Sequence, residues 1–462
     1  MLERLTTIDA SFVYLEEPDA PMHVGGVLLL EPPAGGLDAL AALVQARLPL
    51  VPRYRQRVVE VPGRLADPVW ADDPEFDVAY HVRQSALPRP GTEAQLLSLV
   101  SRLTARRLDP RRPLWELYLV EGLADGRVAV ITKTHPALVD GLGAVDIAQV
   151  LLDPSPTPEL PAPDAEPWRP RRLPTGAELL RTAVTEYVQR PSAAVEGLAA
   201  AATDVRATLA RVGGAASGFV RAARSAVFPA PQSPLNHARG RQRRVAFARA
   251  DLEDLKAVRR AHGGTINDVL LTVLTGALRD WLLSRGIAVV ASTSVRALVP
   301  VSVQSDEQEA PGSRVASYLV DLPVGEPNPR VRLARLSYAM RGVARSGRSV
   351  GADALIALTG FAPPTLHALG ARAARGLSRR MFNLVITNVP GPQVPLFAAG
   401  ARMHEVFPVV PLVRGQGLSI GMTSYDGRVC VCLNADRDTV GDVDLLADLI
   451  EQEMAELVEA SR

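Results

Sequence analysis

A histidine and an aspartate lie five residues apart in the first third of the chain, at His135 and Asp140. The imidazole of a histidine is partly neutral near pH 7, so it can take a proton from a reacting hydroxyl group. Asp140 is followed by Gly141, and this dipeptide is typical of a turn. The residue types therefore indicate proton transfer beside a loop.

The segments on both sides of this loop have the patterns of a strand and a helix. Residues 128–134 form a β-branched, apolar run that predicts a buried strand, and Pro136 ends it. Strand ends and helix starts are where open α/β folds place their functional residues. The predicted helix follows the Asp-Gly turn, with apolar residues at helical spacing at Leu142, Val145, Ala148 and Leu151.

The segment 133–141 resembles the His-His-x-x-x-Asp-Gly signature of the bacterial wax ester synthase/diacylglycerol acyltransferase family, part of the coenzyme A-dependent acyltransferase superfamily. Aligned on Asp140-Gly141, His135 stands at the first histidine position and Pro136 at the second. The family takes the second histidine as its general base. The resemblance therefore implies a catalytic set of His135, Asp140 and Gly141, with the usual base position occupied by proline.

Other blocks of the sequence resemble further motifs of the same family, in the expected order and over nearly the whole chain. They imply substrate contacts by Trp115 in Pro-Leu-Trp-Glu, by Asn267-Asp268, and by Asn388 and Gly391 in Asn-Val-Pro-Gly-Pro. Simpler roles stay open. Trp115 can be a core residue beneath the site. Thr265 and Asp268 have the spacing of a helix capping box, which leaves Asn267 unexplained.

Two more residues have roles that the sequence leaves open. His23, in Pro-Met-His-Val, precedes an apolar strand, and it is either a packed residue or a wall of an acyl tunnel. Arg296 begins a strand that matches the family. By superfamily logic, Arg296 is a candidate ion-pair partner of Asp140, because an aspartate at a buried turn needs one.

Pro136 cannot act as a base, and loss of a positioned base typically slows a reaction about 10²- to 10⁴-fold. Three outcomes are open. His135 can serve as the base after a one-residue shift, the protein can be a slow enzyme, or it can bind lipid without catalysis. His135 can also be a supporting residue that hydrogen-bonds nearby backbone and holds the loop.

The composition excludes several functions. The 462 residues carry a net charge of +1, which gives no basic field, so we expect no nucleic-acid partner. The two cysteines, Cys430 and Cys432, share one face of a strand-like run and predict neither a disulfide framework nor a metal site. We find no signal peptide and no apolar run long enough to span a membrane.

The length and the breaks in composition predict two α/β domains and a connector. The boundaries are residues 1–152 for the first domain, 153–240 for a Pro-rich linker with an amphipathic helical arm, and 241–462 for the second domain. The resemblance implies that both domains are chloramphenicol-acetyltransferase-like, each a mixed sheet flanked by helices, with the site in a tunnel between them.

The resemblance also implies the reaction: an acyl group moves from acyl-CoA to diacylglycerol or a long-chain alcohol, with no cofactor and no metal. The expected location is the cytoplasm, or the surface of the inner membrane or of lipid droplets, where Arg206, Arg211, Arg221 and Arg224 on one side of the arm can meet anionic lipid. The alternatives are a non-catalytic homologue that binds lipid or acyl-CoA and a condensation-type enzyme that acylates an amine.

Overall fold

The computed structural model describes most of both predicted domains and part of the connector. Asp140, Gly141, most of the helix expected over 142–151 and most of the amphipathic arm lie outside the described residues. The described residues are 3–17, 20–139, 150–158, 160–161, 168–189, 229–236, 240–303, 314–346, 381–413 and 415–461.

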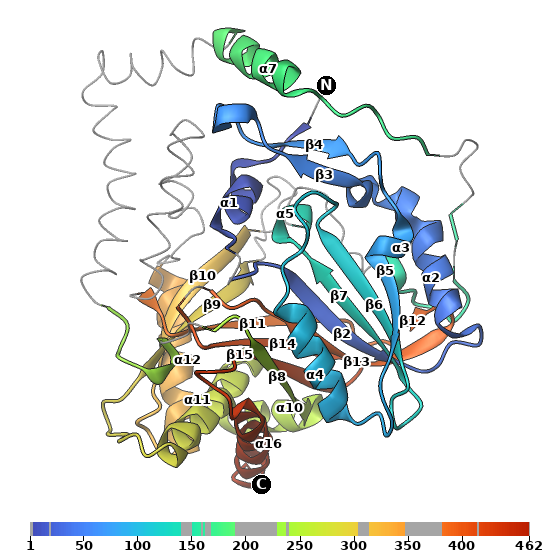
Figure 1. The fold of residues 1–462 in the computed structure, drawn as a ribbon. Helices are drawn as coiled ribbons and strands as arrows, with labels where there is room; N and C mark the ends of the chain where they lie inside the picture. The colour runs from blue at the N-terminus through green and yellow to red at the C-terminus, as the bar shows by residue number, and fades with distance from the viewer. Residues whose placement is uncertain are drawn as a thin grey trace, which may run out of the picture.

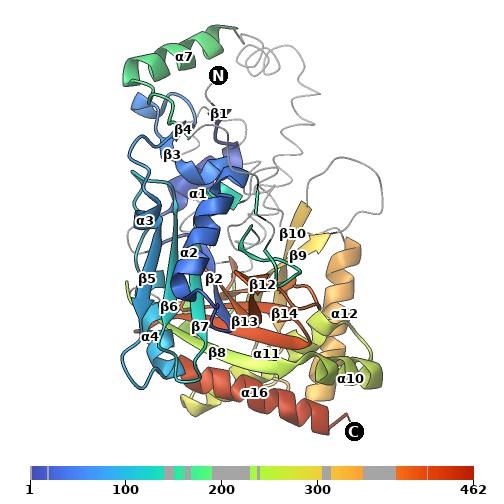
Figure 2. The same ribbon diagram turned by 90° about the vertical axis from the view of Figure 1, so that its right-hand side faces the viewer.

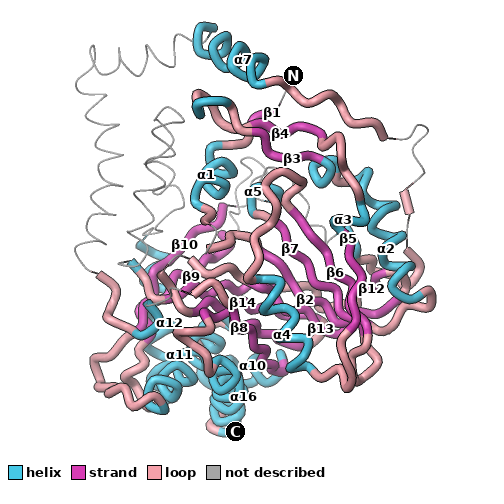
Figure 3. The backbone as a smooth tube through the Cα atoms, in the orientation of Figure 1, coloured by secondary structure: helices cyan, strands magenta, loops and turns pink. Residues whose placement is uncertain are grey.

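A six-stranded sheet forms the centre of the first half, with the strand order β12-β13-β2-β7-β6-β5 (Figures 1 and 3). β5 runs parallel to β6 and the other neighbours are antiparallel, so the sheet is mixed. The strand expected at residues 128–134 is confirmed, and all seven of its residues are buried. The strands are β2 (Val24–Leu30), β5 (Val82–Ala86), β6 (Trp115–Glu121), β7 (Val128–Thr134), β12 (Phe397–Ala398) and β13 (Ala401–Val409).

A second six-stranded sheet has the order β10-β9-β11-β14-β15-β8, in which β11 runs parallel to both of its neighbours. The hairpin expected around Asp426-Gly427 is confirmed, and both turn residues have the positive φ angles that a tight hairpin turn requires. The strands are β8 (Arg243–Asp251), β9 (Val295–Val303), β10 (Arg314–Leu322), β11 (Leu384–Pro390), β14 (Leu418–Tyr425) and β15 (Arg428–Asp436).

A three-stranded sheet and the helices complete the described structure. The small sheet has the order β1-β4-β3 and lies near α7, which buries Leu179 and Ala183 against it (Figure 1). Its strands are β1 (Glu3–Arg4), β3 (Gln56–Val59) and β4 (Val69–Asp72). The helices are α1 (Thr7–Leu15), α2 (Gly36–Arg47), α3 (Val78–His81), α4 (Glu93–Thr104), α5 (Pro136–Val139), α7 (Gly176–Gln189), α10 (Leu252–His262), α11 (Ile266–Ser284), α12 (Pro329–Ser346) and α16 (Val443–Glu459).

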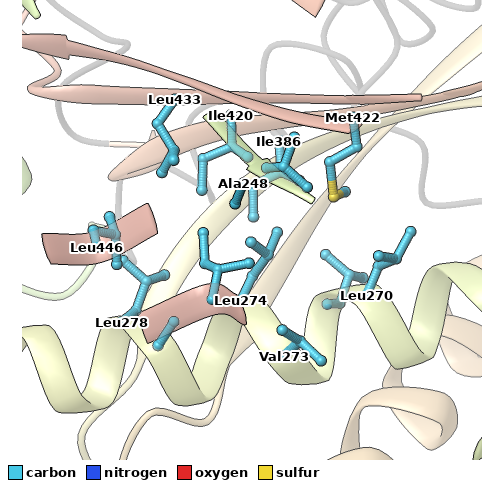
Figure 4. Packing of buried hydrophobic residues seen from close by; sticks show 14 of the residues in the cluster. Ala248, Leu270, Val273, Leu274, Leu278, Ile386, Ile420, Met422, Leu433 and Leu446 are labelled. Atoms are coloured by element: carbon cyan, nitrogen blue, oxygen red, sulfur yellow. The ribbon is translucent and has the colours of Figure 1, made fainter. Parts of the chain in front are cut away.

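The core of the second half lies between its sheet and α11. Leu270, Leu274 and Leu278 project from α11 toward side chains of β11, β14 and β15 (Figure 4). These positions recur every four residues, so they lie along one face of the helix. α10 and α16 lie on the same side of the sheet as α11 (Figure 2), so helices cover this face.

The C-terminal half of the chain contributes strands to the first sheet. β13 comes from the C-terminal half of the chain but pairs antiparallel with β2 in the first sheet, from Met403 opposite Leu30 to Val409 opposite Gly25. β13 also contacts β14 and β15 of the second sheet, so it belongs to the contact between the sheets (Figures 1 and 2). The sequence did not predict this contribution to the first sheet, and the domain boundaries at residues 152 and 240 stay a prediction.

A buried ion pair joins three helices of the second half. The Arg332 guanidinium of α12 lies 3.3 Å from the Glu453 carboxylate of α16, and both side chains are less than a tenth exposed. Gly276 of α11 leaves the space for them, because a Cβ there would lie 1.9 Å from Arg332 Nη1 and 2.0 Å from Glu453 Oε2. The glycine is therefore required by packing and not by backbone conformation.

We predict that Gly276→Ala lowers the free energy of unfolding by about 2–4 kcal/mol, because the methyl group must displace a buried ion pair. Gly342→Ala in α12 is the matched control, since a Cβ at Gly342 meets nothing within 4 Å. Alanine is the better helix former, so the control should stabilise the protein by about 0.5–1 kcal/mol. Urea unfolding measures both, and equal effects would contradict the packing argument.

Candidate functional site

His135 lies between the end of β7 and the first residue of α5, and its side chain caps this short helix. The backbone N–H of Ala137 donates to His135 Nδ1 at 3.2 Å, and the Leu138 N–H donates to the His135 carbonyl at 2.9 Å. Pro136 is the first residue of α5, a position that suits proline because the backbone N–H there needs no helical partner. Pro136 therefore suits the start of the helix but supplies no basic group.

The cap fixes which nitrogen of His135 carries the proton. Because Nδ1 accepts a hydrogen bond, the neutral ring must carry its hydrogen on Nε2. Nε2 has no hydrogen-bond partner within the described part of the chain, and the residue is 1% exposed. Burial, and then the nearby charge of Arg107, lower the pKa of His135 to about 4. At neutral pH the ring is therefore uncharged and presents a donor.

His23 lies across the sheet from His135. The β2–β7 register pairs Val24 with Thr134 and Gly25 with Lys133, so one further step places His23 opposite His135. Directly opposite residues of an antiparallel pair project from the same face of the sheet. His23 is buried, and its Nδ1 has no hydrogen-bond partner in the part of the chain that the structure describes.

Burial lowers the pKa of His23 well below its ordinary value. The charges of Lys133, His135 and Arg243 lower it further, and a hydrogen bond to the backbone of Thr104 works in the opposite direction. A backbone group that raises a histidine pKa is an accepting carbonyl. With Nδ1 free of partners, the Thr104 bond is assigned to Nε2–H, which leaves a bare lone pair on Nδ1.

The two histidines lie on the side of the first sheet that meets the second half. The buried cluster on this face joins residues of β2, β7 and α4 with Val245 and Phe247 of β8. Phe247 stacks on Phe407 of β13 at 3.7 Å between ring centroids, and the Val245 N–H donates to Ser101 Oγ. The pair therefore lies beside the junction of the two halves. The predicted tunnel at this junction stays a prediction.

Lys133, two residues before His135, is 1% exposed, and its positive charge is neutralised by a partner within the protein. Its ammonium donates to Glu116 at 3.1 Å and to the carbonyl of Arg106 at 2.9 Å. Glu116 also accepts from the Tyr118 hydroxyl. Burial lowers the pKa of Lys133, but the paired carboxylate opposes this. The tetrapeptide that contains Glu116 thus supplies a counter-charge next to the site.

Trp115 is completely buried on the opposite face of the first sheet. Its indole N–H donates to the Tyr54 carbonyl at 2.8 Å, and its ring stacks on His81 at 4.7 Å. These contacts agree with the simpler role of a core residue beneath the site. The predicted substrate contact of Trp115 stays a prediction.

Two predicted substrate-binding residues from separate motifs meet in the structure. Asn388 of β11 donates its amide N–H to the side-chain oxygen of Asn267 at 3.2 Å. The capping box of Thr265 and Asp268 is confirmed, and Asp268 also accepts from the Ser337 hydroxyl. Asp268 Oδ2 therefore accepts from the Thr265 N–H of the cap and from the Ser337 hydroxyl, whereas Asn267, which the capping box does not explain, contacts the second motif.

Gly391 and Arg296 also have contacts within the protein. A Cβ at Gly391 would lie 2.5 Å from the Ser424 carbonyl oxygen, which explains the glycine by close approach of the backbone. Arg296 forms an ion pair with Asp321 at 2.6 Å. Its predicted partner Asp140 and the motif residue Gly141 lie outside the described residues, so these roles stay predictions.

Comparisons with known proteins place both halves in one family. Residues 5–270 match the wax ester synthase/diacylglycerol acyltransferase catalytic domain, and residues 311–458 match the WS/DGAT C-terminal domain. Two Mycobacterium tuberculosis H37Rv proteins are each 34% identical over 466 residues. "Probable diacyglycerol O-acyltransferase tgs2" is covered over 98% of both chains, and "Probable diacyglycerol O-acyltransferase tgs1" over 100% of this chain and 97% of its own.

Solved structures agree with the predicted fold. A wax ester synthase/diacylglycerol acyltransferase from Marinobacter aquaeolei VT8 superposes with a TM-score of 0.70 at 28% identity over 99% of both chains. The first condensation domain of the calcium-dependent antibiotic synthetase gives a TM-score of 0.58 at 17% identity, over 100% of this chain and 96% of that one. The predicted pair of chloramphenicol-acetyltransferase-like domains is confirmed.

Sequence reasoning left the contribution of His23 open. Its position next to His135 follows from extending the β2–β7 register by one residue, and this register is known only once the two distant strands are seen to pair.

The described residues contain no group of three or more potential metal ligands. They also contain no helix that is long and apolar enough to cross a membrane.

We predict that His135 makes the protein less stable in acid. The folded-state pKa of about 4 lies below the ordinary value of 6.5, so the contribution of the neutral His135 ring to the free energy of unfolding is present above pH 6.5 and is lost as the pH falls toward 4. His135→Asn keeps a capping acceptor but has no titrating ring. Between pH 6.5 and pH 4 its free energy of unfolding should fall less than that of wild type, and the difference should be up to about 3 kcal/mol.

Denaturant unfolding between pH 4 and pH 7.5 measures this difference. His135→Ala is the matched control, because it removes the titrating ring and also the cap, at a further cost of about 1 kcal/mol at every pH. Equal pH dependence in wild type and His135→Asn would contradict a buried, neutral imidazole.

Proposed function

Because this chain belongs to the wax ester synthase/diacylglycerol acyltransferase family, we propose that it transfers a fatty acyl group from acyl-CoA to an alcohol, either diacylglycerol or a long-chain alcohol. The product is a triacylglycerol or a wax ester. The observation that carries this proposal is the match over nearly the full length of relatives that are named acyltransferases, with both family domains present.

The site supports this chemistry because acyl transfer to an alcohol needs few protein groups. A base takes the hydroxyl proton as the oxygen attacks the thioester carbon, and a donor stabilises the charge that develops on the oxygen. The buried surroundings of His135 exclude water, which would compete with the alcohol for the acyl group. The Asn267–Asn388 pair is proposed to contact substrate where the two motifs meet.

The second candidate is a homologue that binds acyl-CoA or neutral lipid and turns over slowly or not at all. Two observations favour it: Pro136 offers no base, and the capping bond leaves a donor on the free nitrogen of His135. A shift of the family base by one residue to His135 would require this cap to break. We therefore propose weakened activity compared with relatives that carry the second histidine.

The decisive comparison uses the purified full chain with labelled acyl-CoA and either diacylglycerol or a long-chain alcohol. We expect slow ester formation by wild type and faster formation by Pro136→His, because the substitution restores a base at the usual position, worth about 10²- to 10⁴-fold in rate. Product analysis by thin-layer chromatography identifies the acceptor. His135→Ala should be slower than wild type.

Each alternative outcome removes one interpretation. Turnover by Pro136→His alone would identify the natural protein as a non-catalytic binder. Activity with an amine acceptor and not with an alcohol would favour a condensation-type acyltransferase. Equal rates in wild type, Pro136→His and His135→Ala would show that neither the missing base at position 136 nor His135 matters for the reaction.

We also propose that the amphipathic arm docks on an anionic lipid surface, through the cluster Arg206, Arg211, Arg221 and Arg224. Replacing these four arginines by serine should weaken sedimentation with phosphatidylglycerol vesicles at low salt and leave activity on dispersed acceptor unchanged. Binding to phosphatidylcholine vesicles is the control. Unchanged sedimentation would contradict the docking role.

A further inference from the structure

We propose that His23 is the proton acceptor of this site, taking the place of the base that Pro136 lacks, with His135 as its hydrogen-bonding counterpart. The inference rests on the proposed acyl transfer and deepens it. It starts from two buried ring nitrogens without partners, Nδ1 of His23 and Nε2 of His135. Each residue lies one step beyond the paired ends of β2 and β7, where Val24 is opposite Thr134, and the two rings are close enough to influence each other electrostatically.

The hydrogen-bonding states of the two rings are complementary. The Ala137 N–H occupies Nδ1 of His135 and leaves Nε2–H as a donor. His23 Nδ1 has no partner in the described part of the chain, and we assign the backbone bond to Thr104, which raises the pKa of His23, to Nε2–H, so that Nδ1 is left as an acceptor. One free donor and one free acceptor are the requirements of a single hydroxyl group, whose oxygen accepts one bond while its hydrogen makes another.

Thr104 is well placed to hold His23 in this state. It is the last residue of α4, where carbonyl groups have no partner within the helix and carry partial negative charge. Such a carbonyl orients the ring, as the partner of a catalytic histidine does in other enzymes. The cationic groups near the ring are Lys133 and Arg243, and His135 adds a positive charge only in acid, so the surroundings favour the neutral form of His23, which is the form that can accept a proton.

The chemical step then balances. The acceptor hydroxyl donates to His23 Nδ1 and accepts from His135 Nε2–H. Its oxygen forms a bond to the thioester carbonyl carbon while its proton passes to Nδ1. The tetrahedral intermediate collapses with cleavage of the carbon–sulfur bond, and the CoA thiolate takes the proton back from Nδ1. The products are an ester and free CoA, and His23 returns to its starting state.

The burial of the two histidines suits a site for a lipid alcohol, and it also limits the rate of acyl transfer. The loss of solvent, and then the charges of Lys133 and Arg243, make His23 a weaker base than an exposed histidine. A weak base in the right position agrees with a slow enzyme, so the inference explains how activity can persist with Pro136.

The test measures kcat and KM for wild type and four variants: His23→Gln, Pro136→His, His23→Gln/Pro136→His and His81→Asn. His23→Gln keeps a donor for the Thr104 carbonyl but has no basic nitrogen. His81 is the matched control, because it is also fully buried, its Nδ1 bonds the Trp115 carbonyl, and its Nε2 is free, but it lies against Trp115 on the opposite face. Asn at position 81 likewise keeps the backbone bond.

We expect His23→Gln to lower kcat about 10²- to 10⁴-fold with little change in KM, and His81→Asn to keep kcat per folded molecule. Adding Pro136→His to His23→Gln should restore turnover, because the usual base position is filled again. A structural role of His23 gives no such rescue. Circular dichroism and thermal unfolding establish the folded fraction, and His23→Asn replaces His23→Gln if that variant does not fold.

The outcomes separate this inference from the proposed function. Wild-type activity that survives His23→Gln within about threefold overturns the role of His23 and leaves acyl transfer intact. Loss in His23→Gln without rescue by Pro136→His also overturns it. Wild type that is inactive while Pro136→His turns over removes both the natural activity and the role of His23.

Discussion

The antiparallel pairing of β2 with β7 is the contact on which the site depends. It runs from Val24 opposite Thr134 to Leu30 opposite Val128 without a shift in register. Gly25 allows the close approach, because a Cβ at this position would lie 2.0 Å from the Thr132 carbonyl oxygen. A slip of one residue would turn every side chain of the strand to the other face. The register therefore places His23 and His135 one residue beyond the last pair of the ladder, on the same side of the sheet.

The surroundings of this ladder place charge and apolar packing on separate faces. Lys133 and its partner Glu116 lie on the same face as the histidines, next to the junction of the two halves. Trp115 and His81 fill the other face with stacked rings and a bond to the Tyr54 carbonyl. A buried ammonium is tolerated only beside a counter-charge. The Pro-Leu-Trp-Glu motif therefore has two structural roles: Glu116 neutralises Lys133 on one face of the sheet, and Trp115 fills the core on the other.

Much of this arrangement could be predicted from local patterns. The β-branched run before His135, the capping box of Thr265 and Asp268, and the turn at Asp426-Gly427 each occur where the sequence places them. All three depend on residues close together in the chain. The meeting of Asn267 with Asn388 and the insertion of β13 beside β2 could not be predicted, because each joins segments more than a hundred residues apart.

The sequence alone determined the family resemblance, the two-domain α/β class and the absence of a base at Pro136, because each is written in residue types and their spacing. The sequence left His135 open between a base and a supporting residue that bonds nearby backbone. The structure shows that its Nδ1 accepts from the Ala137 N–H, and the packing that buries the ring, which only the tertiary structure supplies, keeps it neutral. It also decided that His23 stands opposite, because strand register is a property of paired backbones and not of either strand by itself.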